Sequence, residues 1–232
     1  MNTTYYERYS KGEELAVWND LRKLENITPA NENWGDITDV MKEAMRRIKF
    51  NIDTIYGHLR TANYRFENSS PRELPHDDIE VKLAQLKKRI EPVGYIPLTL
   101  EYFYRIVGSV DFTHTFVDYY VKGSEEFMQS MKDDFAYECA DPICVASVDT
   151  VLELMGEDEE WEENMEDCIA DGEKPYIDIA PDFYHKDNVS GGAPYAVEVS
   201  PKPLVDSLFM NTPYGNGIYF IDYLRLCFEW GG

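Results

Sequence analysis

The residues whose types and spacing come closest to a reactive group lie in the stretch Asp178–Asp187. Asp182, His185, Lys186 and Asp187 place an imidazole, two carboxylates and an ammonium group close together along the chain. Such a set could perform acid–base chemistry if it converged in a cleft that shifts the pKa values of its members. Neighbours along a turn usually point in different directions. The structural alternative, which we favour, is that Asp182 caps a turn and that His185 pairs with a local carboxylate or carbonyl.

No other pattern in the chain is typical of a catalytic or metal site. The glycine clusters at 188–194 and 214–217 lack the spacing and the lysine of a phosphate-binding loop, and G-x-S-x-G and H-E-x-x-H are absent. The four cysteines lack the paired short spacing of a zinc site, so we expect free thiols. They are Cys139, Cys144, Cys168 and Cys227. The sequence therefore predicts no catalytic residue, no metal and no cofactor.

The densest charge lies between Gly156 and Glu173, where ten acidic residues occur without a Lys or Arg. Such a stretch repels the phosphates of nucleic acids and attracts basic proteins. We therefore predict no nucleic-acid binding and a basic protein partner. The expected contact residues are Glu157, Asp158, Glu159, Glu160, Trp161, Glu162, Glu163, Glu166 and Asp167. The alternative is a solvated acidic loop that only keeps the protein in solution.

The charge divides the chain into two parts. Residues 1–96 carry 15 Lys and Arg against 16 Asp and Glu, and residues 97–232 carry 7 against 28. The link between them, Val93 to Pro97, is too short and too apolar for a free linker, so we expect one domain over residues 1–232. No signal peptide or membrane-spanning stretch is found, which predicts a cytoplasmic protein without membrane contact.

Helical patterns dominate the first part. Residues 13–25 place Leu15, Trp18, Leu21 and Leu24 on one face, and Asp36 is the expected N-cap of a long helix that runs to about Ala62. A further helix, capped by Asp77 or Asp78, is predicted to end before Pro92, and another is predicted from Leu98 to Val107, closed by Gly108.

Shorter apolar runs follow, at 142–148, 176–180 and 195–199, and a terminal helix is predicted within 218–230. The run YAVEV at 195–199 alternates as a half-buried strand does. Helices first and strands afterwards favour an α+β fold. The expected architecture is a helical N-terminal part packed against a mixed or antiparallel sheet with a C-terminal helix.

The segment from Ile96 to Gly108 resembles the entry of the SUKH superfamily, in which a proline precedes a short aromatic helix and a glycine. Pro97, Tyr102, Phe103 and Gly108 occupy those places. The later run from Asp178 through the SGG turn to Arg225 looks like a larger group of uncharacterised bacterial proteins with the same C-terminal pattern. The superfamily comprises bacterial immunity proteins and relatives of a yeast cell-wall-synthesis regulator. The long helical N-terminal part departs from its smaller members.

The resemblance implies binding rather than catalysis, because it carries over no catalytic residue. An immunity protein neutralises a toxin, often a nuclease, and such toxins are often basic. Our leading hypothesis is a non-enzymatic protein-binding module of this kind. Two alternatives stay open: a housekeeping or structural protein, and a small-molecule enzyme that uses Asp182, His185 and Asp187.

Overall fold

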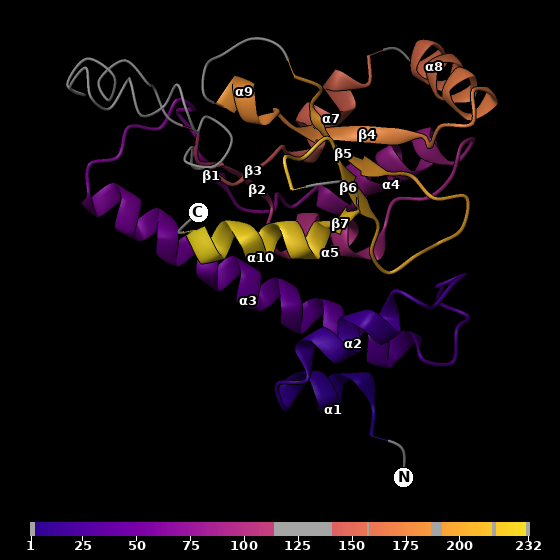
Figure 1. Cartoon of the computed structure of the whole chain (residues 1–232), viewed down its shortest axis with the longest axis horizontal. Coiled ribbons are helices and arrows are strands. Elements are labelled where there is room, and N and C mark those ends of the chain that lie inside the picture. The colour runs from indigo at the N-terminus through magenta and orange to yellow at the C-terminus, as the bar shows by residue number, and fades with distance from the viewer. Residues whose placement is uncertain (1–2, 114–140, 157, 187–191, 215–216, 231–232) are drawn as a thin grey trace.

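The computed structural model describes residues 3–113, 141–156, 158–186, 192–214 and 217–230. It confirms the predicted α+β class: helices come first, two antiparallel sheets follow, and a C-terminal helix packs against a sheet (Figure 1). This last helix, α10 (Phe220–Trp230), contacts β6 (Leu208–Met210) and β7 (Ile218–Tyr219).

Helices α1 (Tyr5–Ser10), α2 (Glu14–Leu21) and α3 (Trp34–Thr61) form the N-terminal part. The long helix was predicted, but its expected cap was wrong. The carboxylate of Asp36 accepts hydrogen bonds from the backbone N–H groups of Tyr5, at 2.7 Å, and Tyr6, at 3.0 Å. The N-cap residue of α1 is Thr4, and Asp36 satisfies two further N–H groups at the start of that helix, because the chain brings the start of α1 against the first turn of α3.

The predicted apolar face of α2 was wrong at one position. Leu15 is 68% exposed, whereas Val17, Trp18 and Leu21 are buried. The buried face of a helix is set by the element that covers it. Here α2 packs against α1, where the ring of Tyr9 meets Trp18 edge to face.

The first sheet has the order β1-β2-β3, formed by β1 (Arg72–Glu73), β2 (Ser109–Asp111) and β3 (Cys144–Val145). Helices α4 (Ile79–Ile90) and α5 (Leu98–Ile106) lie between β1 and β2 in the chain, close to their predicted bounds. Gly108 ends α5 with a φ of +98°, and a Cβ there would lie 2.2 Å from the carbonyl oxygen of Glu73. The glycine is therefore required for the close approach of α5 to β1.

The second sheet has the order β4-β5-β6-β7 and includes β4 (Tyr176–Ala180) and β5 (Tyr195–Glu198), both close to the predicted runs. All four residues of β5 are buried, so its predicted half-buried character was wrong. The run at 142–148 is a strand only at β3, since α7 (Val148–Leu154) begins at its end. The backbone N–H of Ala146 donates to the carbonyl oxygen of Ile179 at 2.7 Å, which places β3 beside the edge strand β4.

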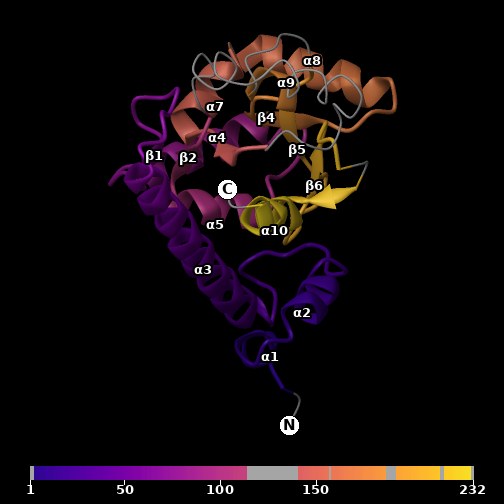
Figure 2. The ribbon, with the colours of Figure 1, turned by 60° about the vertical axis from the view of Figure 1, so that its left-hand side comes forward.

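Helices cover both sides of the second sheet. Helices α7, α8 (Asp158–Ala170) and α9 (Phe183–Lys186) lie on one side, and α5 and α10 lie on the other, toward the N-terminal helices (Figures 1 and 2). The face of β4 that is turned toward α7 and α8 positions the groups described below. No helix in the described ranges is both long enough and apolar enough to cross a membrane.

Candidate acidic binding surface

The acidic stretch folds as a helix, so its interpretation as a loop was wrong. In α8, Trp161 and Met165 lie one helical turn apart and are 7% and 6% exposed. Both belong to the hydrophobic core of the molecule. The two side chains anchor α8 to the protein, and the helix periodicity then turns its carboxylates outward.

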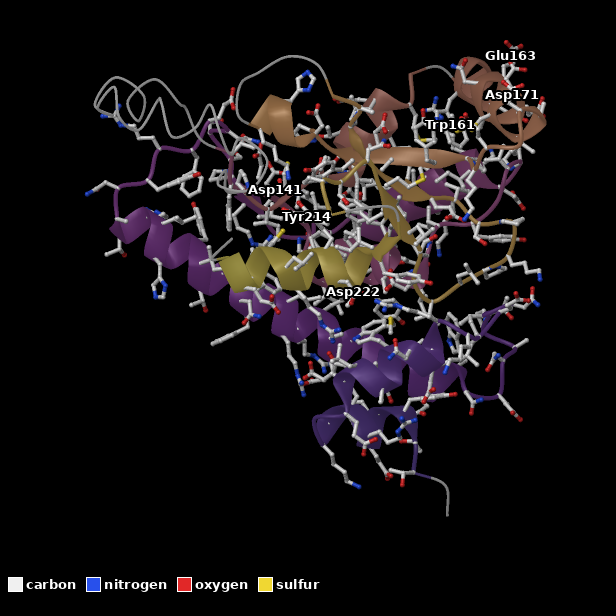
Figure 3. The ribbon with its side chains drawn as sticks, viewed as in Figure 1. Asp141, Trp161, Glu163, Asp171, Tyr214 and Asp222 are labelled. Carbon is white, nitrogen blue, oxygen red and sulfur yellow. The ribbon has the colours of Figure 1, made fainter. Side chains whose placement is uncertain are left out.

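The outer face of α8 carries Glu163, Glu166 and Asp167, all exposed. Figure 3 shows Glu163 at the outer side of the helix and Trp161 on the side toward β4. Within the described residues, no Lys or Arg forms an ion pair with these three carboxylates. Several cations of the N-terminal part are already bound to other carboxylates; examples are Arg8, Arg22, Lys42, Arg47 and Lys49. In the described part of the chain, these three carboxylates of α8 therefore have no ion-pair partner.

The other predicted contact residues lie as follows. Glu157 lies outside the described residues, Asp158, Glu159 and Glu160 form the first turn of α8, and Glu162 is half-buried. Trp161 is buried, and its indole therefore serves as an anchor of the helix rather than as part of the exposed face.

A cavity of about 360 Å³ lies between α7, α8 and β4. Its apolar wall includes Met155, Trp161 and Met165, and its acidic members are Asp167, Asp171, Glu173 and Asp178. Asp178 comes from β4, and burial raises the pKa of its carboxyl group. The Oδ1 atom of this group is buried and has no hydrogen-bond partner.

The predicted pair Asp182 and His185 lies at one end of a second cavity, of about 460 Å³. Nδ1 of His185 contacts Oδ2 of Asp182, and the backbone N–H of His185 donates to Oδ1 of the same carboxylate at 3.3 Å. This geometry confirms the structural interpretation, in which Asp182 caps a turn and pairs with His185. The imidazole side chain is 51% exposed, and Asp187 lies outside the described residues.

Lys186 does not join this pair. Its side chain is fully buried, and its Nζ lies 2.6 Å from Oδ1 of Asp141, which is also fully buried. The same Nζ donates to the hydroxyl of Tyr223 at 3.0 Å. The hydroxyls of Tyr195 and Tyr214 donate to Oδ2 of Asp141 at 3.1 and 3.0 Å, and Figure 3 shows Asp141 and Tyr214 near each other.

Burial raises the pKa of Tyr195, Tyr214 and Tyr223, so these hydroxyls stay protonated and act as donors or neutral acceptors. Each buried charge therefore has its partners, as a buried ion pair requires. The network joins α9, β5 and α10, and it acts as a structural crosslink. Sequence reasoning missed it because its members come from distant segments.

Among the described residues, no set of three or more His, Cys, Asp or Glu side chains is placed to hold a metal ion. Cys144, Cys168 and Cys227 are free thiols, as predicted, and Cys139 lies outside the described residues.

Comparison with known protein families, with curated proteins and with solved structures finds no match to this chain. The resemblance to the SUKH superfamily therefore stays a prediction.

Proposed function

We propose that this protein is a non-enzymatic binding module that engages a basic protein partner through the outer face of α8. The observation that carries the proposal is the exposed row Glu163, Glu166 and Asp167, which forms no ion pair with a Lys or Arg of the described part of the chain. The helix is fixed by the buried Trp161 and Met165, so the carboxylates are held on a rigid element.

The net charge of −22 favours the same role. A surface of one sign steers an oppositely charged partner during diffusion and raises the association rate. The effect weakens as salt shortens the range of the electrostatic field. Binding through α8 should therefore depend strongly on ionic strength.

A basic toxin of the nuclease type is the partner class to test first. A nuclease needs a basic surface to bind nucleic-acid phosphates, and an acidic helix can cover such a surface. The sequence resemblance to immunity proteins favours the same class.

The first experiment compares the wild-type protein with a triple variant, Glu163→Gln, Glu166→Gln and Asp167→Asn. The probe is a fluorescent peptide in which lysine alternates with serine, and its association rate is measured by stopped flow at low and physiological ionic strength. Removing three steering charges should slow association at low salt about tenfold or more and flatten the salt dependence.

A matched control removes three exposed carboxylates elsewhere: Glu7→Gln, Glu32→Gln and Glu229→Gln. This variant has the same net charge as the triple α8 variant. If the two variants slow association equally, the effect comes from total charge and α8 is not the binding face. If the wild-type protein does not bind the peptide at all, the proposed function is wrong.

A further inference from the structure

The two cavities adjoin along β4. Leu154 and Asp178 line both the cavity of about 360 Å³ beneath α8 and the cavity of about 460 Å³ that reaches Asp182 and His185. Together they form a groove, here called the β4 groove, that runs from the end of α8 to α9. Leu154 is 63% exposed, so an apolar side chain stands open to solvent where the two cavities meet.

The charges of the β4 groove are of one sign. Asp167, Asp171 and Glu173 line the part near α8, and Asp111 and Asp182 line the other part. Among the described residues that line either cavity there is no Lys or Arg. A ligand that complements this groove must be cationic.

Asp178 lies at the centre of the groove. Its Oδ1 is buried and without a hydrogen-bond partner, whereas the buried carboxylate of Asp141 has a lysine and two tyrosines. A buried carboxylate oxygen without a donor costs free energy, and a donor or cation removes that cost. Unlike Asp141, Asp178 is only half-buried and lines both cavities, so a cationic group that enters the groove meets its carboxyl group.

We propose that the β4 groove binds an extended segment of the basic partner and that one lysine or arginine side chain of this segment contacts Asp178. The methylene groups of that side chain lie along Met155 and Trp161, and its charged end reaches the carboxylate. This inference rests on the proposed function and adds the residue at which the partner is anchored.

The test compares Asp178→Asn with Glu163→Gln in equilibrium binding of the lysine–serine peptide. Each variant loses one carboxylate, but Glu163 lies on the outer face of α8 and does not line the groove. Loss of a charge-assisted contact at Asp178 should weaken binding about tenfold, and Glu163→Gln should have a much smaller effect. Equal affinities of the two variants would overturn the proposal.

The outcomes separate this inference from the proposed function. A double variant, Glu163→Gln and Glu166→Gln, changes the face of α8 without changing a residue that lines the groove. If this double variant binds the peptide more weakly than the wild-type protein, but Asp178→Asn binds as Glu163→Gln does, the function stands and the groove assignment is wrong. A peptide in which norleucine replaces lysine keeps the methylene groups without the charge. Asp178→Asn and Glu163→Gln should bind this norleucine peptide with equal affinity.

If Asp178→Asn does not fold, NMR spectroscopy of the wild-type protein tests the same contact. The ¹³C resonance of the Asp178 carboxyl group should shift when the lysine–serine peptide is added, and an unchanged resonance at saturation would contradict the proposal. Free n-butylammonium carries the same chemical group without a peptide. If it binds as tightly as the peptide, the groove takes a free amine and the assignment to a partner segment is wrong.

Discussion

The carboxyl group of Asp206 joins the N-terminal helices to the second sheet and titrates in an unusual range. Its side chain is fully buried and accepts from the guanidinium of Arg22 at 2.9 Å and from the hydroxyl of Thr99 at 3.0 Å. Burial nevertheless raises its pKa from 3.8 to about 6, because desolvation outweighs the attraction of Arg22. The charged form is the costlier one in the folded protein.

Because the pKa of Asp206 is higher in the folded state, its protonation favours folding. Between pH 3.8 and about 6 the folded state holds a proton that the unfolded state has lost. Stability from this group is therefore present below pH 3.8 and is lost as the pH rises through about 6. A shift of this size corresponds to about 3 kcal/mol of the free energy of unfolding.

We expect Asp206→Asn to remove this contribution to the pH dependence. Relative to the wild-type protein, the free energy of unfolding of the variant should rise by about 3 kcal/mol as the pH increases across that range. Urea denaturation at a series of pH values measures it. Asp39→Asn, at a carboxylate that is 54% exposed, controls for the loss of one charge. A constant difference between Asp206→Asn and the wild-type protein would contradict the assignment.

At the scale of the elements, the turn at Gly108 sets how α5 meets the first sheet. The guanidinium of Arg72 donates to the carbonyl oxygens of Glu73, Val107 and Ser109 at 2.7, 2.7 and 2.9 Å, which holds the turn against β1. An alanine at Gly108 would meet both a positive φ and the carbonyl of Glu73. The backbone would have to move, and these hydrogen bonds would weaken.

Gly108→Ala should therefore lower the free energy of unfolding by about 2 kcal/mol or more, and Tm by at least about 4 °C. Gly57→Ala is the matched control, because it lies within α3 and has nothing within 4 Å of an added Cβ. The control should raise stability by up to about 1 kcal/mol, since alanine favours the helix. Thermal denaturation followed by circular dichroism measures both, and two variants of equal stability would refute the role of the turn.

How far the sequence predicts each element depends on how local its determinants are. The long apolar stripe of α3 and the strand runs at β4 and β5 depend on residues close in the chain, and all three elements were predicted. The hydrogen bonds from Tyr5 and Tyr6 to Asp36 depend on a contact between distant segments, and they were not predicted. In α8 the spacing of Trp161 and Met165 was a usable helix signal, but the charge run concealed it.

The candidate site was predicted in part for the same reason. The acidic residues of α8 and the Asp182–His185 pair are local features of the sequence. Asp178, the groove beside it and the Lys186–Asp141 network depend on how α7, α8, β4 and α10 pack together. No spacing along the chain shows that the carboxylate of Asp141 has a lysine and two tyrosines as donors while Oδ1 of Asp178 has no hydrogen-bond partner.

At the scale of the whole molecule, many contacts cross between residues 1–96 and 97–232. Arg22 pairs with Asp206 and with Asp222, each at 2.9 Å, and Lys82 pairs with Asp149 at 2.7 Å. The backbone N–H of Ile27 donates to the carbonyl oxygen of Pro203. We therefore expect the two parts to unfold together as one cooperative unit.

Arg22→Met tests this prediction, because it leaves Asp206 buried without its cation. Loss of one partner of a buried pair should cost about 3–5 kcal/mol. Hydrogen–deuterium exchange in increasing denaturant reports each part separately, and the variant should lower the unfolding midpoint of both parts by the same amount. Lys23→Met, at a side chain that is 73% exposed, should leave both midpoints unchanged. If only the N-terminal part has a lower unfolding midpoint in the variant, then residues 1–96 and 97–232 are separate folding units. The acidic part would then stay folded when the N-terminal helices unfold.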